Sequence, residues 1–257
     1  MMTTLWILVL TLVGCWCVAR AIDWYPAHLA QEDQLMVDMA VAHQRGDTVA
    51  VEAMAATQLS GWPLLRDFLR APPARGWSSL IGALLALLLA GCVVTTYGAT
   101  LAAVCWLLFG WGLIVLAFVD ARTKLLPDAL TFPLLWLGVV VQLFPETRSV
   151  GLTASIWGVI AGYLPMWLVA QLYRLLRGRD GLGFGDLKLL AAMGAWSGVA
   201  ILPGTVLIAA ISALIAQLSL RLLRRDGNDW HAEFPFGPWI IAAYLICLAT
   251  GFTLTPL

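Results

Sequence analysis

Charged residues are scarce in this sequence: they make up 12% of its 257 residues, whereas 61% of the residues are hydrophobic. A soluble domain is usually about one quarter charged and about one half apolar. One aqueous core could not bury so much apolar surface, and the mean hydropathy of +0.87 agrees with this. The sequence therefore predicts an all-α polytopic membrane protein, in which several helices cross a lipid bilayer.

The sequence also lacks an excess of either charge, and it lacks paired cysteines. Its 15 basic and 15 acidic residues give a net charge of zero, so no nucleic-acid partner is expected. The five cysteines lie in apolar runs, and none forms a C-x-x-C pair. We therefore expect neither disulfides nor a zinc site, and the three scattered histidines add no metal-ligand cluster.

No lysine or arginine precedes the first apolar run, residues 3–19. A secretory signal peptide begins with a basic region. We therefore interpret this run as a retained helix and residues 1–20 as a first transmembrane segment.

Eight apolar runs are candidates for membrane spans. They fall near residues 3–19, 79–97, 100–119, 129–145, 151–173, 187–200, 201–222 and 235–254. If the N-terminus faces outward, 14 of the 15 basic residues lie on the inward side, and only Arg148 lies on the outer side. Such an asymmetry is typical of the cytoplasmic side of a membrane protein. We expect a small helical cytoplasmic loop domain at residues 21–77 and a membrane-embedded domain at residues 78–257.

Two acidic residues lie at the inward ends of predicted spans, where acidic side chains are costly and usually functional. Asp120 ends the third apolar run, and Asp186 precedes the sixth. Two carboxylates in contact share a proton, so one can activate water while the other protonates a carbonyl or leaving amine. Each acid also has a structural alternative. Asp120 could pair with Arg122 or Lys124. Asp186 could be a helix N-cap.

Glycines surround the second acid: Gly183 and Gly185 both precede Asp186 closely. Glycine permits a positive φ and a close approach of the backbone. We therefore expect room for an extended substrate strand beside this carboxylate, which favours a functional role for Asp186.

Two sequence blocks resemble the active-site blocks of the type IV prepilin peptidases. The first, residues 119–135, begins with Val-Asp and contains Leu-Pro-Asp. The second, residues 181–192, contains Gly-Phe-Gly-Asp and matches the G-x-G-D motif. Residues 234–238, Phe-Pro-Phe-Gly-Pro, are similar to the family's entry into its last span. The resemblance covers about residues 78–254.

This resemblance implies that Asp120 and Asp186 are the catalytic dyad of a membrane aspartic endopeptidase. Asp128, the rival acid in the first block, is interpreted as a helix cap or an acceptor near the site. For Lys188 two roles stay open: it either steers the charge of the dyad or marks the cytoplasmic interface.

The resemblance also implies a substrate: type IV prepilins, or the pseudopilins of type II secretion, with a short basic leader ahead of a hydrophobic helix. Cleavage would fall at the cytoplasmic boundary of the bacterial inner membrane, and proteolysis would need no cofactor. Three acids of the first loop, Glu32, Asp33 and Asp38, are candidates for attracting the basic leader.

The N-terminal third departs from the family. Typical members carry two zinc-binding C-x-x-C pairs in this loop, and they also N-methylate the new terminus with S-adenosylmethionine. Residues 21–77 contain no cysteine and are interpreted as short amphipathic helices near 35–41, 49–59 and 64–69. Zinc is therefore not expected, and S-adenosylmethionine is expected only if methylation is retained.

Three other functions could use the same residues. A G-x-G-D enzyme of the signal-peptide-peptidase type would carry its first aspartate inside a span, whereas Asp120 ends one. A proton-coupled transporter would use the two carboxylates as a relay, but such proteins usually show paired half-repeats. A catalytically inactive assembly factor would not need two intact blocks.

Overall fold

The protein is described here by a computed structural model that covers residues 2–45, 49, 68, 76–178, 183–223 and 234–252. The helices in this part of the chain are α1 (Met2–Gln44), α4 (Trp77–Tyr97), α5 (Leu101–Thr123), α6 (Asp128–Val141), α7 (Leu152–Arg177), α8 (Phe184–Ser197), α9 (Leu202–Leu223) and α10 (Gly237–Thr250). Five of them, α1, α4, α5, α7 and α9, are long and apolar enough to cross a membrane. The predicted all-α polytopic membrane fold is confirmed.

Glycines with positive φ end two helices whose apolar runs follow one another closely in the sequence. Gly98 (φ 64°) ends α4, between the runs predicted at residues 79–97 and 100–119. Gly198 (φ 74°) ends α8, two residues before the predicted end of the run at residues 187–200. Residues 202–204 form the first turn of α9. Pro203 is tolerated there because the first turn of a helix needs no backbone donor.

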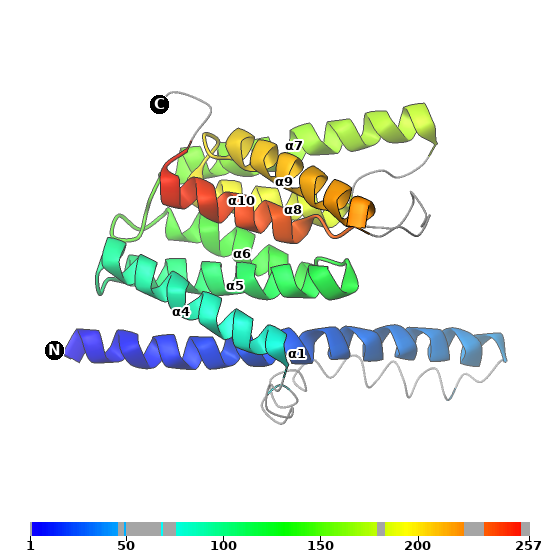
Figure 1. Ribbon diagram of the computed structural model, residues 1–257, viewed down its shortest axis with the longest axis horizontal. Helices are drawn as coiled ribbons and strands as arrows, with labels where there is room; N and C mark the ends of the chain where they lie inside the picture. Colours follow the sequence, from blue (N-terminus) through cyan, green and yellow to red (C-terminus); the bar gives the residue numbers. More distant parts are fainter. Residues whose placement is uncertain are drawn as a thin grey trace.

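The first helix is longer than the predicted run of residues 3–19. It continues to Gln44 and includes the separate helix expected at residues 35–41. Figure 1 shows α1 extending well past the rest of the bundle. The helices expected at residues 49–59 and 64–69 lie outside the described residues, apart from Val49 and Phe68.

α1 continues through a proline because a residue of another helix replaces the hydrogen bond that the proline cannot make. Pro26 has no N–H, so it cannot donate to the carbonyl of Ile22 one turn earlier. Arg122 of α5 donates its Nη1 to that carbonyl at 2.7 Å instead. An external donor therefore satisfies the group that the proline leaves open, and it ties α1 to α5.

Aromatic stacking orients α5 and α8 in the centre of the bundle. Phe109, in the first half of α5, stacks on Trp196, near the end of α8, with ring centroids 4.4 Å apart. The two helices therefore run in opposite directions, and the end of α5 lies at the level of the start of α8. We call this end, where α5 stops and α8 and α10 begin, the aspartate end; it lies on the right in Figure 1.

The short helix α8 is held by close packing against α7. A Cβ on Gly158 would lie 2.0 Å from the carbonyl oxygen of Gly194, and one on Gly162 would lie 2.5 Å from that of Leu190. The two backbones therefore touch directly, as small residues permit in membrane helices. Gly194 of α8 and the Gly158-x-x-x-Gly162 pair of α7 make this close approach possible.

Uncharged polar groups close the opposite end of the bundle, between α6 and α7, which we call the glutamine end. The Gln142 side chain is 3% exposed. Its Oε1 accepts N–H groups of Ser149, Val150 and Gly151 at 3.0–3.2 Å. Its Nε2 donates to the Ser149 hydroxyl, which donates to the Trp196 carbonyl at 2.8 Å. This network joins the α6–α7 turn to the end of α8.

Candidate active site

Asp120 lies in the last turn of α5, and its side chain is only 4% exposed. Its Oδ2 accepts a hydrogen bond of 3.0 Å from the N–H of Gly237, the first residue of α10. The N-terminus of a helix carries partial positive charge and unpaired N–H groups. The start of α10 therefore stabilises negative charge on Asp120.

The close approach at Gly237 depends on the absence of a side chain. A Cβ at this position would lie 2.8 Å from Asp120 Oδ2 and 3.1 Å from its Cγ. Any other residue would push α10 and the carboxylate apart. The resemblance at residues 234–238 predicts no role for Gly237, although a glycine before a proline at the start of an apolar run is a recognisable signal.

The structural alternative for Asp120, an ion pair with Arg122, is wrong. Arg122 pairs with Asp23 of α1, with 3.1 Å between Nη2 and Oδ1. It also donates to the Ile22 carbonyl and to the Ser78 hydroxyl. The guanidinium is thus used to join α1, α4 and α5. The second proposed partner, Lys124, ends α5 with φ 55°, and its backbone N–H donates to the Asp120 carbonyl at 2.8 Å.

Asp186 lies in the first turn of α8, outside the five candidate membrane spans. It is not the N-cap, so that structural alternative is also wrong: the N-cap is Gly183, three residues earlier. Burial and, to a smaller extent, the nearby charge of Asp120 raise the pKa of Asp186 to about 7. The two carboxylates therefore interact electrostatically, and Asp186 holds a proton at pH values at which an exposed aspartate is ionised.

The glycines before Asp186 act differently from the expectation. Neither has a positive φ; Gly183 is extended, with φ −69°, and Gly185 is helical. A Cβ on Gly185 would lie 2.8 Å from the Cβ of Leu126. Gly185 therefore lets α8 begin directly against the segment that joins α5 to α6, which brings Asp186 towards Asp120.

Asp128 and Lys188 form an ion pair at the same end of the bundle. The distance between Lys188 Nζ and Asp128 Oδ1 is 2.5 Å, and Nζ also lies 5.1 Å from the centre of the Phe132 ring. Asp128 is the first residue of α6, after the N-cap Pro127, so it is not itself a cap. The pair links the first turns of α6 and α8.

The acids suggested for leader binding lie on α1. Glu32 pairs with His28 at 3.3 Å, and Asp38 accepts a hydrogen bond of 3.2 Å from Gln34. Asp33 is also exposed on this helix. All three acids lie in the C-terminal half of α1.

The chemistry available at the aspartate end is acid–base chemistry. Two interacting carboxylates and a backbone donor from α10 can activate water and move a proton. Within the described residues, no three His, Cys, Asp or Glu side chains are grouped closely enough to hold a metal ion.

Comparison with known proteins places both aspartates in one family region. Residues 107–218 match the model of the type IV leader peptidase family. Proteins named prepilin leader peptidase/N-methyltransferase are similar to the chain, with 37% identity over 169 residues in Stutzerimonas stutzeri and 40% over 169 residues in Pseudomonas aeruginosa. Each match covers 65% of this chain and 57% of the relative. In Dichelobacter nodosus the identity is 45% over 143 residues, or 55% of this chain and 47% of the relative.

These matches confirm the resemblance to the type IV prepilin peptidases in the region that holds both blocks. The chain spans about half the length of the curated relatives that it matches. No solved structure matches. A protease family with these relatives does not favour the transporter alternative.

Proposed function

We propose that the chain is a membrane aspartic endopeptidase that removes the short basic leader from type IV prepilins or from type II secretion pseudopilins. One observation carries this proposal: Asp120 and Asp186, from the two matched blocks, lie at the same end of the bundle and interact through their charges. The two aspartates are far apart in the sequence, and the antiparallel arrangement of α5 and α8 brings them to the same end of the bundle.

The two carboxylates have different surroundings, and this assigns their roles. Asp120 receives the Gly237 N–H and the positive end of α10, so it is the ionised member that removes a proton from water. Asp186, with a pKa of about 7, is the protonated member that donates its proton to the scissile carbonyl as the water attacks. When the C–N bond breaks, Asp186 takes a proton back from a hydroxyl of the tetrahedral intermediate, and Asp120 gives the proton that it took from water to the leaving amine. The pair is then back in its starting state.

The position of basic residues supports a cytoplasmic site in the bacterial inner membrane. Five basic residues lie at or next to the aspartate end of α5, α7 and α8: Arg122, Lys124, Arg174, Arg177 and Lys188. Arg148 lies at the glutamine end, between α6 and α7. Positive residues gather on the cytoplasmic side of membrane proteins. The leader would then be cut where a hydrophobic helix enters the bilayer.

The role of S-adenosylmethionine depends on a second activity. The relatives' names include N-methyltransferase, but residues 21–77 of this chain offer no cysteine for a zinc site. Mass spectrometry of the processed substrate decides the matter: a mass increase of one methyl group at the new N-terminus means that the chain is bifunctional. An unmodified amine means that it is a peptidase alone.

The direct test removes one carboxylate at a time while keeping its shape. Asp120→Asn and Asp186→Asn should each abolish cleavage of a co-expressed prepilin, while both variants stay in the membrane at the wild-type level. Glu146→Gln is the matched control, because Glu146 is an exposed acid at the glutamine end. Normal processing by either aspartate variant would refute the assignment.

A further inference from the structure

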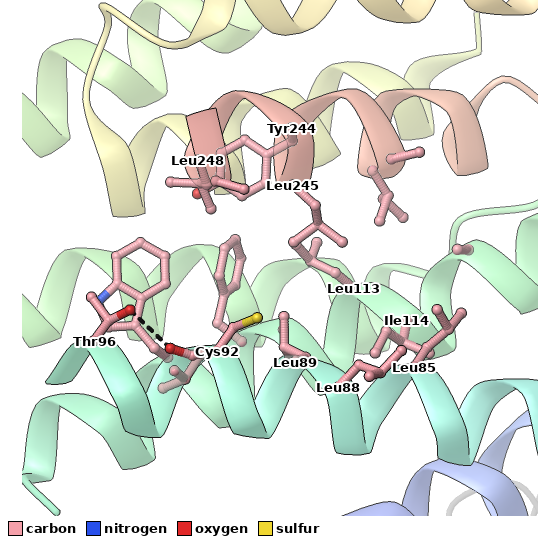
Figure 2. A pocket seen from close by; sticks show the side chains of 18 of the residues that line it. Leu85, Leu88, Leu89, Cys92, Thr96, Leu113, Ile114, Tyr244, Leu245 and Leu248 are labelled. Carbon is pink, nitrogen blue, oxygen red and sulfur yellow. Dashed lines mark hydrogen bonds between the residues drawn. The ribbon is translucent and has the colours of Figure 1, made fainter. Parts of the chain in front are cut away.

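An apolar groove lies beside the candidate active site, between α4 and α10 and over α5 (Figure 2). α4 packs against α1 and α5, and α10 packs against α5, α8 and α9. Within the described helices, α4 and α10 do not contact each other. The space left between them is a cavity of about 540 Å³.

The two walls of the groove present side chains at helical spacing. The wall residues include Leu85, Leu88 and Cys92 of α4, and Ile241, Leu245 and Leu248 of α10. Figure 2 shows Leu85, Leu88 and Cys92 of α4 on one side of the gap and Leu245 and Leu248 of α10 on the other. Such spacing, i to i+3 or i+4 and then i+7, is how a helix presents one face to a partner helix. Each of the two helices therefore offers a packing face against which none of the other described helices packs.

The groove favours an occupant that brings no unpaired polar group. Its Thr96 hydroxyl already donates to the Cys92 carbonyl at 2.8 Å. Its Tyr244 hydroxyl is already paired with Ser197 at 2.6 Å. In lipid, a peptide segment satisfies its own backbone only as a helix. An apolar α-helix is therefore the peptide that fits.

One end of the groove adjoins the two aspartates. Ala117 and Phe118 line it just before Asp120, and Pro238 lines it just after Gly237. From this end the α4 wall continues from Leu85 to Thr96, which is about 16 Å along a helix. An apolar helix in the groove would therefore bring its end to the dyad.

We infer that this groove is the docking site for the apolar helix of the substrate, with the leader end of that helix at Asp120 and Asp186. The inference rests on the proposed peptidase function and adds where the substrate binds. A lipid chain or a second copy of this protein would also cover apolar surface, but the groove ends at the catalytic groups, which favours the molecule that must reach them.

The native Cys92 provides a probe of the groove, since it is exposed and lines the α4 wall. The full-length enzyme keeps Cys92, its other four cysteines become alanine, and Asp186→Asn traps the complex. The partner is a synthetic substrate with a lysine-rich leader ending in glycine, followed by an apolar helix of roughly 20 residues. A single cysteine is moved along that helix, and disulfide cross-linking is measured in membranes.

We expect cross-links to Cys92 to recur every three to four substrate positions, because only one face of the helix meets the α4 wall. The control enzyme carries Cys92→Ala with Val169→Cys; Val169 is 57% exposed on α7 and does not line the groove. Equal cross-linking at both sites, no cross-linking at Cys92, or cross-links between two enzyme copies that substrate does not displace would each overturn the docking site. If the active enzyme still cleaves the substrate in those cases, the proposed function stands. If it cleaves no such substrate, both proposals fail.

A matched pair of bulky substitutions tests the same site through kinetics. Ala242→Trp would fill the groove, whereas Ala210→Trp places the same side chain on an exposed part of α9. We expect Ala242→Trp to lower kcat/KM for the full substrate by about tenfold or more, mainly through KM. Cleavage of a short soluble peptide that spans the leader junction should be unchanged, as should both activities of Ala210→Trp. An unchanged kcat/KM of Ala242→Trp for the full substrate would overturn the inference.

Discussion

Gln142 at one end of the bundle and the two aspartates at the other differ in how many hydrogen-bond partners they have. At the glutamine end, Gln142 accepts three backbone N–H groups and donates to Ser149, so a buried amide is fully paired. At the aspartate end, Asp120 accepts one backbone N–H, and Asp186 is opposed by the like charge of Asp120. Fully paired buried groups stabilise a fold. Charged groups with few partners are found where chemistry is done.

We therefore expect the glutamine end to contribute mainly to stability and the aspartate end mainly to activity. α8 carries Asp186 at one end and Trp196 at the other, and the Trp196 carbonyl accepts the Ser149 hydroxyl. The well-paired end fixes α8 so that its other end can hold a carboxyl group in an unfavourable environment. Substitutions at the two ends should therefore affect different measurements.

The largest effect is expected from Gly237→Ala, which would move α10 away from Asp120. Its Cβ has only 2.8 Å to Asp120 Oδ2, so the hydrogen bond from residue 237 would be lost or distorted. We expect kcat to fall by about 100-fold, as when one preorganised donor is removed from an active site.

Gly91→Ala is the matched control for that substitution, since a Cβ on Gly91 meets nothing within 4 Å. Its kcat should equal that of the wild type. If Gly237→Ala cleaved a prepilin at the wild-type rate, the donor would have no part in catalysis.

At the glutamine end, Gln142→Leu should lower stability and leave catalysis intact. It would leave the N–H groups of Ser149, Val150 and Gly151 without their acceptor, and each hydrogen bond lost contributes about 0.5–1.5 kcal/mol. The measurement is the melting temperature in detergent, together with kcat per folded molecule. Gln34→Leu, at an exposed position of α1, should change neither quantity. A loss of kcat without a lower melting temperature would contradict the division between the two ends.

The pH dependence of cleavage should depend on the protonation of Asp186 and not on the hydrogen bonds of the glutamine end. Asp186 must be protonated to act as the acid, and its pKa is about 7. Above this pH the proton is lost, so kcat/KM should fall by about tenfold per pH unit. The Gln142→Leu variant should show the same profile at a temperature where it is folded. A rate that stays constant to a pH of about 9 would show that Asp186 is not the acid.

The smallest effect is expected from the ion pair of Asp128 and Lys188. This pair is partly exposed, and such pairs contribute about 0–1 kcal/mol. Asp128→Asn and Lys188→Gln should each lower kcat by about two- to fivefold, by loosening the start of α8 beside Asp186. Because both act through one contact, the double variant should be no slower than the slower single variant. Additive losses would show that the two residues act separately.

The sequence by itself determined where the apolar helices of residues 78–257 lie, and it singled out the two acids. Hydropathy located α4 to α10 within a few residues, because each lipid-facing helix must be apolar over most of its length. It misplaced the end of α1, because the apolar run ends at residue 19 whereas the helix continues through more polar residues to Gln44. The Ile22 carbonyl, left open by Pro26, finds its donor in Arg122, which lies far away in sequence.

The tertiary structure alone decided which groups surround the two acids. The pairing of Arg122 with Asp23 leaves Asp120 facing Gly237, and the residue pattern around Asp120 favoured neither partner. The sequence likewise predicted a positive φ at the glycines before Asp186, but neither has one. Gly185 instead allows α8 to pack closely against Leu126. Local sequence dictates helices, since their hydrogen bonds are local. The partners of a buried charge are set by which helix ends meet, and that depends on packing across the whole bundle.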